Sequence, residues 1–481
     1  MNSSYNVKAM NSKAVDLNLL STFHPRETFA QRSALVQAFK FFILAVVWLS
    51  IIFVVAAGAG LTFAWKAPFV FNELMPIWFP AIDKQIFKNL ADIHAYLAPT
   101  VVVATIIPVN ALFMVLCERK FLSLLTVRIG PDAVGPNGGL QTLADALKLL
   151  FKEDTVPKNS DPILFFLAPA LFFAPSMVVF LPLLAVAANR LGGFIYADLD
   201  ISLIFILGFL SLGTMSLVMA GWASNNKYSL MGGLRAASQA ISYEIPLVLA
   251  IISIIMLSGS VNLFEISEAQ AGGILNWNLL GNGELPRILN LFASTNGNFF
   301  DGCVTLVYVT LCVSLFLIFI TASTAEVNRI PFDIPEAESE LVSGFNTEFS
   351  GMKFALFFLA EYTNLFIASA IASILFLGGS HLPISIEAEQ ALYSALTNLN
   401  ISLPVIGTFN GMFEGLNFVW VITSITLLVK IYLMFLIAIW VRATLPRLRQ
   451  DQLMEFGWKY LIPLTLAILF LMAIILEYIK S

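Results

Sequence analysis

The chain has 481 residues, of which 58% are hydrophobic and only 12% are charged. Soluble domains carry about 25% charged residues, and a soluble fold of this length could not bury so much apolar surface. The composition therefore excludes an ordinary soluble protein and indicates one that lies in a lipid bilayer. The net charge of −5 argues against a nucleic-acid partner.

Nine continuous apolar runs are long enough to cross a bilayer as helices, which takes about 20 residues each. They are residues 41–64, 96–117, 162–188, 201–223, 243–260, 302–325, 354–378, 416–441 and 459–478, and the run at 243–260 is the shortest. Because the runs are continuous rather than alternating, we expect helices and no strands. The sequence therefore predicts an all-α polytopic membrane protein with about nine transmembrane helices.

The first apolar run follows about forty mostly polar residues and is too long for the core of a signal peptide. We expect it to be retained as a helix. Residues 1–95 then form an N-terminal extension with one extra transmembrane helix, and residues 96–481 form the main membrane domain.

Charge bias predicts the orientation, since Lys and Arg gather on the cytoplasmic side of membrane proteins. With the N-terminus inside, nineteen Lys and Arg lie in inner segments and six in outer ones. This split predicts a multi-pass protein with a cytoplasmic N-terminus and a C-terminus on the opposite side. The outer segments 261–301 and 379–415 carry few charges, and we expect them to be caps with little chemistry.

The first inner loop begins at Glu118 and contains two Gly-Pro steps and a Gly-Gly pair, which predict tight, fixed turns. The segment 140–152 follows with leucines on one helical face and charges away from it. It is expected to be an amphipathic helix along the membrane interface. Such a helix is either a structural surface helix or the floor of a site for a lipid-like ligand.

The second inner loop is expected to run from Gly221 to Glu244 and to be folded, because it holds many hydrogen-bonding side chains. Glu244 would open the next helix, with Pro246 in its first turn. An acid at a helix N-terminus is favoured by the helix dipole, so a capping role is one interpretation of Glu244.

The third inner loop, residues 326–348, holds six carboxylates and a single basic residue, Arg329. Clustered acids repel one another and share protons. A solvated acidic face is the usual explanation for such a run. Here two apolar spans flank the run, prolines interrupt it, and it contains Phe332, so we expect a packed, functional acid cluster.

Two charges fall within the spans themselves, Glu361 and Lys430. A charge at the bilayer centre costs about 2.5–3.5 kcal/mol on insertion scales, so such groups face a partner or water and suggest an ion or proton path. Glu118, Glu244 and Glu326 each lie at the inner end of an expected helix. Together these acids would form a chain from the inner loops to mid-membrane, able to relay protons if burial brings their pKa values near neutral.

Cysteine and histidine are sparse: Cys117, Cys303, Cys312, His24, His94 and His381. No CxxC occurs and the histidines are scattered, so a metal site, a disulfide framework or an iron–sulfur cluster in this chain is not expected. No Walker loop or GxGxxG is present, so nucleotide chemistry is expected in another chain.

Four stretches carry a resemblance to a known family. They are ERKFLSLLTVRIGPDAVGPNGGLQTLADALKLLFKED (118–154), GWASNNKYSLMGGLRAASQAISYE (221–244), AEVNRIPFDIPEAESELVSGFNTEFSGMKFALFFLAEYTN (325–364) and RATLPRLRQDQLMEFGWKYLIPLTL (442–466). They resemble the quinone-site membrane subunit of respiratory complex I (NADH:quinone oxidoreductase), which is the H-type subunit of bacteria and the subunit 1 type of mitochondria. The similarity covers about residues 96–478.

The resemblance implies an eight-helix domain that forms much of a quinone tunnel at the junction with the soluble arm, opening to lipid beside the amphipathic helix. It implies quinone as the substrate, with no flavin or iron–sulfur cluster in this chain. The expected partners are soluble quinone-site subunits on the cytoplasmic face, neighbouring small membrane subunits and membrane lipid. The expected location is the bacterial inner membrane.

Carried over residue by residue, four arginines would lie near the quinone path or the junction: Arg119, Arg128, Arg235 and Arg329. Nine acids would form the route that links quinone reduction to proton pumping: Glu118, Glu244, Glu326, Asp333, Glu336, Glu338, Glu340, Glu348 and Glu361. Lys430 would lie in or beside the membrane part of that route.

Two alternative functions stay open. The homologous membrane subunit of a membrane-bound [NiFe] hydrogenase or formate hydrogenlyase shares the fold but needs no quinone tunnel. A free-standing ion or proton transporter would need no large ordered inner surface for docking soluble subunits.

Overall fold

The computed structural model describes residues 107–188, 199–281, 299–335, 338–397 and 418–480, and every regular element among them is helical. Within this part, seven helices are long and apolar enough to cross a membrane. They are α6 (Pro162–Ala188), α7 (Ser202–Ala223), α8 (Lys227–Ser258), α11 (Phe299–Glu326), α13 (Gly351–Phe376), α16 (Phe418–Thr444) and the run formed by α17 (Gln450–Glu455), the π-helical turn η9 (Phe456–Leu461) and α18 (Ile462–Lys480). The prediction of a helical multi-span protein is confirmed for these residues.

Two expected spans bear on the total number of helices. The run at 41–64 lies outside the described residues, and the run at 96–117 is described only from residue 107, where a helix continues to residue 125. The number nine, the extra N-terminal helix and the division at residue 95 therefore stay predictions.

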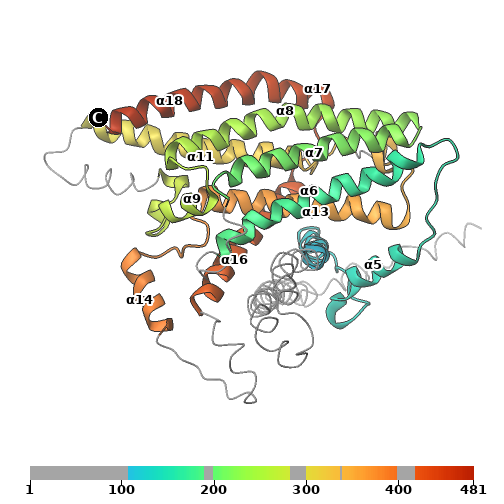
Figure 1. Ribbon diagram of the computed structural model, residues 1–481, viewed down its shortest axis with the longest axis horizontal. Helices are drawn as coiled ribbons and strands as arrows, with labels where there is room; N and C mark the ends of the chain where they lie inside the picture. Colours follow the sequence, from blue (N-terminus) through green and yellow to red (C-terminus); the bar gives the residue numbers. More distant parts are fainter. Residues whose placement is uncertain (1–106, 189–198, 282–298, 336–337, 398–417, 481) are drawn as a thin grey trace, which may run out of the picture.

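The long helices lie side by side as one bundle (Figure 1). α6, α7, α8 and α11 pack in chain order, α13 lies against α6 and α16, and α18 covers α8 and α11. Helices suit such apolar runs because a helix satisfies its own backbone hydrogen bonds, which lipid cannot do. Lipid-embedded helices also tolerate interior proline, and α6 contains Pro169, Pro175 and Pro182.

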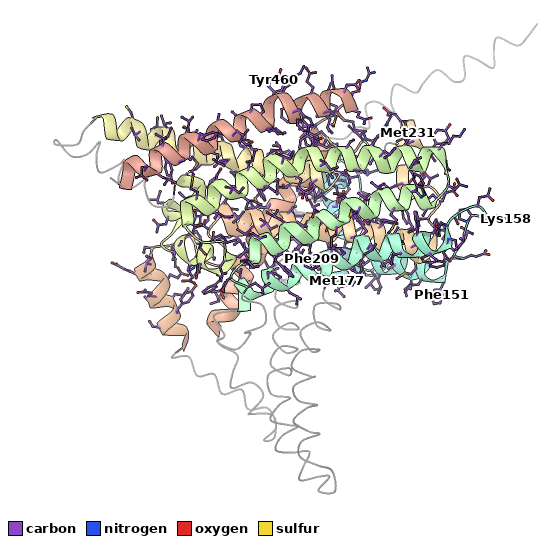
Figure 2. All side chains as sticks on the ribbon, turned by 45° about the horizontal axis from the view of Figure 1, so that its top comes forward. Phe151, Lys158, Met177, Phe209, Met231 and Tyr460 are labelled. Atoms are coloured by element: carbon purple, nitrogen blue, oxygen red, sulfur yellow. The ribbon has the colours of Figure 1, made fainter. Side chains whose placement is uncertain are left out.

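Aromatic side chains fill the interior where α6, α13 and the third inner loop meet. Phe165 stacks on Phe349 with ring centroids 4.3 Å apart, and Phe349 meets Phe357 edge-on at 5.0 Å. The outer faces stay apolar and exposed, as at Phe470 and at Tyr460 (Figure 2). Exposed apolar faces on all sides are what a lipid surrounding requires.

The two ends of the bundle differ. One end, called the loop end here, carries α5 (Gln141–Phe151), α12 (Glu338–Leu341) and the turns η4 (Pro136–Gly138) and η8 (Gly344–Asn346). Phe151, Lys158 and Met231 lie together at this end (Figure 2). The other, called the distal end, carries α9 (Leu263–Ala269), α14 (Ile386–Thr397) and the turns η6 (Ile274–Asn276) and η7 (Asn278–Leu280) (Figure 1).

The prediction of a second inner loop over residues 221–244 is wrong. The connection is only three residues long, because Asn226 caps α8 by accepting a hydrogen bond from the backbone N–H of Tyr228 at 3.0 Å. Glu244 and Pro246 then lie inside a helix of 32 residues rather than at its start, so a cap role for Glu244 is excluded. The expected shortest span is part of α8, the longest helix among the described residues, whose polar first half packs against η8 and α12 at the loop end.

The first inner loop also starts later than expected. The helix continues to residue 125, so Glu118, Arg119 and Lys120 lie on a helix. The predicted tight turns follow, with Gly135 at φ +74° and Gly138 at φ +68°. A side chain at residue 138 would collide with the carbonyl of Pro131, so glycine is required there.

The predicted amphipathic helix is confirmed as α5. Its leucine face stays exposed, as Leu143, Leu147 and Leu150 show, and nothing in the described part of this chain covers it.

Candidate functional site

A buried carboxylate lies at the centre of the loop end. Glu118 is 3% exposed. The Nη1 of Arg329 lies 3.3 Å from its Oε2, and Arg442 donates to its Oε1. These three residues come from the helix at 107–125, the segment after α11 and the end of α16. A buried charge needs partners of this kind, because desolvation alone would make it very costly.

Arg329 is held on two further sides. Its guanidinium lies over the ring of Tyr362 at 4.2 Å, a cation–π contact. The turn that carries it is fastened by Gln239 of α8, whose side-chain amide donates to the carbonyls of Ala325 and Phe332, both at 2.8 Å. The third inner loop is therefore packed against α8. Its Phe332 is 4% exposed, so the prediction that this loop is packed is confirmed for its described part.

A cavity of about 50 Å³ lies next to this turn, among α6, α7, α8, α11 and α13. Glu326 and Glu361 both line it, together with Thr214, Ser323, Asn328 and Asn364 and a wall of apolar side chains. A water molecule needs about 10–15 Å³ and two to four polar partners. The cavity therefore has the size and the lining to hold water between two carboxylates of separate helices.

Three further predicted acids lie around the same end, each with a partner. Asp333 accepts from Arg447 at 2.8 Å, Glu340 from Arg235 at 2.7 Å, and Glu348 from Asn226 at 2.7 Å. The acidic loop is thus joined to α8 and to the chain after α16. Glu244 lies on α8, near enough to Glu326 for the two charges to act on each other.

The first loop has its own contacts. Arg119 pairs with Asp145 of α5 at 2.6 Å, with both side chains partly exposed. Lys120 donates to the carbonyl of Asn137, and burial lowers its pKa from the usual value, an effect that the charge of Asp132 opposes. The turns are therefore fixed to the helix that carries Glu118.

Comparison with known proteins gives the family. The sequence profile described as NADH dehydrogenase matches residues 98–473. The chain belongs to this family. It is 41% identical to the H-type subunit of NADH-quinone oxidoreductase from Geobacillus thermodenitrificans, over 76% of this chain and 89% of that protein. The corresponding protein of Bacillus mycoides is 42% identical over 76% and 88%, and that of Anoxybacillus flavithermus is 40% identical over 75% and 88%.

Some of the residues that the NADH dehydrogenase resemblance selected do not join the cluster. Arg128 is exposed. Lys430 lies at the distal end, where it donates to backbone carbonyls, and it does not line the cavity. Glu336 lies outside the described residues, as does the side chain of Glu338. The structure therefore brings together most of the predicted acids and separates Lys430 from them.

Sequence reasoning missed the partners on the other chain segments. Arg442 and Arg447 pair with Glu118 and Asp333, and Gln239 holds the turn that carries Arg329. A signal for the arginines was present, since four basic residues follow the apolar run of α16 and face an acid-rich loop on the same side. No signal in the sequence indicates Gln239.

Among the described residues, no three His, Cys, Asp or Glu side chains are grouped in a way that could hold a metal ion. The described cysteines are unbridged, with Cys117 and Cys312 buried and Cys303 exposed.

Proposed function

We propose that this chain works as the H-type membrane subunit of a proton-pumping NADH-quinone oxidoreductase. The support is membership of the NADH dehydrogenase family and likeness to relatives of that name along three quarters of the chain. Its expected partners are the other subunits of that complex, with soluble ones docked on the loop end. The catalysed reaction, quinone reduction by NADH, belongs to the whole complex, and electrons reach the quinone from a neighbouring subunit.

The quinone is proposed to bind at the loop end, along a path beside Arg119, Arg128, Arg235 and Arg329. The exposed leucine face of α5 supports an entry from lipid there, because a quinone tail is apolar and needs an apolar surface where it enters the protein. Arg329 supports the inner part of the path, since it carries a mostly buried positive charge that would attract the negative charge of a reduced quinone.

The proton route is proposed to run from Glu118 and the third loop to the cavity between Glu326 and Glu361. That cavity is the observation that carries the proposal, because two carboxylates from separate transmembrane helices line a space large enough for water. Reducing a quinone consumes two protons and creates negative charge. That charge would compete with Glu118 for Arg329, and the freed carboxylate would then favour protonation.

Glu361→Gln tests the route, because glutamine keeps the shape of the side chain and removes the proton it could carry. In the assembled complex in sealed vesicles, we expect protons pumped per electron to fall by half or more. Quinone reduction in the presence of an uncoupler should stay within about threefold of the wild type. Unchanged pumping per electron would show that Glu361 is not on the route.

Asp451→Asn is the matched control, since Asp451 lies at the same end but is 79% exposed and paired with an equally exposed Arg449. This variant should change neither the protons pumped per electron nor the rate of quinone reduction.

The size of the native assembly separates this function from a free-standing transporter. A chain that runs on a native gel only with soluble redox subunits excludes the lone transporter, and quinone reduction by that assembly excludes the hydrogenase. The C-terminus and the distal end are proposed to lie outside a bacterial inner membrane, as the charge bias indicates.

A further inference from the structure

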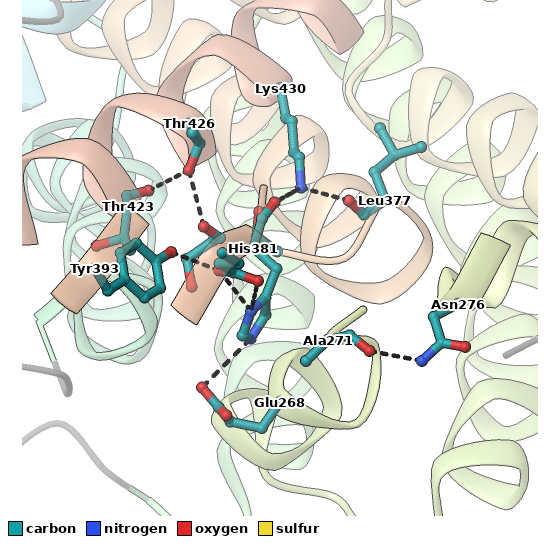
Figure 3. Close-up of polar contacts among 12 residues, drawn as sticks. Glu268, Ala271, Asn276, Leu377, His381, Tyr393, Thr423, Thr426 and Lys430 are labelled. Carbon is teal, nitrogen blue, oxygen red and sulfur yellow. Dashed lines mark hydrogen bonds and ion pairs between the residues drawn. The ribbon is translucent and has the colours of Figure 1, made fainter. Parts of the chain in front are cut away.

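The distal end holds a cluster of ionisable side chains that the proposed proton route does not use (Figure 3). His381 is 2% exposed. Its Nδ1 lies 3.2 Å from Oε1 of Glu389 on α14, and its Nε2 lies 3.3 Å from Oε1 of Glu268 on α9. Tyr393 of α14 donates its hydroxyl to Glu389 at 2.5 Å. The outer segments 261–301 and 379–415 were expected to be caps with little chemistry, and their described parts contribute Glu268, His381, Glu389 and Tyr393 to this cluster.

The arrangement of the ring favours its charged form. A neutral imidazole has one N–H and one lone pair, whereas an imidazolium donates from both nitrogens. Here each ring nitrogen faces a carboxylate, so a neutral ring would direct a lone pair at negative charge. A protonated His381 makes two charge-assisted hydrogen bonds instead.

The same loop binds a partly buried lysine. Nζ of Lys430, on α16, donates to the carbonyls of Leu377 at 2.6 Å, Gly379 at 3.0 Å and His381 at 2.7 Å. These contacts use all three donors of the ammonium group. The backbone turns toward Lys430 through Gly378 and Gly379, at φ +73° and +49°. The position of the His381 backbone, and hence of its ring, is therefore coupled to Lys430.

We propose that His381, with Glu268 and Glu389, forms a proton-binding site at the distal end, and that the bound proton fastens the loop 377–381 around Lys430. The ligand is a single proton from solution. Glu268 is the point of exchange, because its side chain is 43% exposed whereas that of Glu389 is 5% exposed.

The step is a simple proton transfer. On binding, a ring nitrogen of His381 forms an N–H bond with a proton that arrives from water at Glu268. On release, that bond breaks, the proton returns to water, and a lone pair then faces a carboxylate. Among the described residues, the ring faces Glu268 from α9 and Glu389 from α14, Tyr393 of α14 contacts Glu389, and Lys430 of α16 contacts the backbone carbonyl of His381. Raising the pH therefore weakens the attachment of the loop to α9 and α14.

This site is separate from the proposed route. Glu361 and Leu377 lie on or next to the same helix, about 24 Å apart at 1.5 Å per residue. The inference thus does not rest on the proposed function. With this site, α16 is held by a charged side chain at two points, Lys430 at the distal end and Arg442 at Glu118.

Hydrogen–deuterium exchange of the purified assembled complex over a pH series tests the proposal. The readout is amide protection in peptides covering residues 374–382 and 386–397, corrected for the intrinsic pH dependence of exchange. In the wild type we expect protection at low pH and its loss above a midpoint. His381→Gln should remove the midpoint, because glutamine does not titrate.

Glu268→Gln should keep the loop folded but move the midpoint down by about one pH unit, because one carboxylate that stabilises the imidazolium is lost. Glu387→Gln, an exposed acid on α14, is the control and should leave the midpoint where the wild type has it.

A wild-type complex without a midpoint, or a His381→Gln complex that retains it, would overturn the proposal. Should His381→Gln fail to assemble, Glu268→Gln decides, since an unchanged midpoint in that variant overturns the proposal equally.

Discussion

Buried charge in this protein is met by charge from distant parts of the chain. The partners of Glu118 are Arg329 and Arg442, which follow it in the sequence by 211 and 324 residues. Removing one member of a buried ion pair leaves its partner uncompensated and costs about 3–5 kcal/mol, more than the whole pair contributes relative to an apolar core. Single substitutions of Glu118, Arg329 or Arg442 are therefore expected to lower stability strongly.

Glu118→Gln should lower the stability of the assembled complex by about 3–5 kcal/mol, since two arginines lose their shared carboxylate. The measurement is the temperature at which a fixed incubation destroys half of the quinone-reductase activity, and it should fall by several degrees. Asp145→Asn removes the partly exposed partner of Arg119 and should cost only about 0–1 kcal/mol. Equal inactivation temperatures for the two variants would contradict this account.

At the residue scale, the acids of the site could be predicted and their partners could not. Charges are rare in so apolar a chain, so Glu118, Glu326 and Glu361 are visible as exceptions in the sequence. Which arginine meets which acid depends on helix packing, which no local pattern encodes. The same reason explains why the histidines look scattered in the sequence. Glu389 and Glu268 reach His381 from two other helices, and no local pattern shows this.

At the scale of elements, α8 shows where sequence patterns mislead. Its first half contains Gly232 and Gly233 among polar side chains, which are ordinary loop signals. In the structure these glycines lie inside a helix and allow close backbone packing, with Gly232 against Gly344 of η8. The spans themselves could be predicted because each apolar run is long and continuous, whereas this extension of α8 could not.

Gly232→Ala tests that packing. The new Cβ would lie 2.7 Å from the Cα of Gly344 and the backbone N of Phe345, and backbone cannot give way as a flexible side chain can. Overpacking costs about 1–3 kcal/mol, and the better helix propensity of alanine returns about 1 kcal/mol. We expect a net loss of stability, seen as a lower inactivation temperature.

Gly208→Ala in α7 is the matched variant, because nothing lies within 4 Å of a Cβ at that position. It should raise stability by about 0.5–1 kcal/mol. A Gly232→Ala complex as stable as the Gly208→Ala complex would show that α8 and η8 do not pack as closely as the structure has them.

At the scale of the whole molecule, the two ends have different charge chemistry. The loop end gathers arginines and carboxylates in pairs near a cavity that Glu326 and Glu361 line, and the distal end holds one histidine between two acids. The long helices between them carry few charges, with Glu244, Glu361 and Lys430 in helix interiors. Such a distribution suits a protein whose ends face two separate aqueous compartments, which the excess of basic residues in the inner segments also indicates.

Cysteine labelling tests which end faces which compartment. Lys158 at the loop end and Glu387 on α14 are both exposed, and either can be replaced by cysteine in a Cys303→Ser background. A membrane-impermeant maleimide added to intact cells should label position 387 and leave position 158 unlabelled. In inverted vesicles washed free of soluble subunits the pattern should reverse, because the positive-inside rule places the loop end in the cytoplasm. Labelling of position 158 in intact, sealed cells would reverse the orientation, and the distal proton site would then exchange with the cytoplasm instead of the outer compartment.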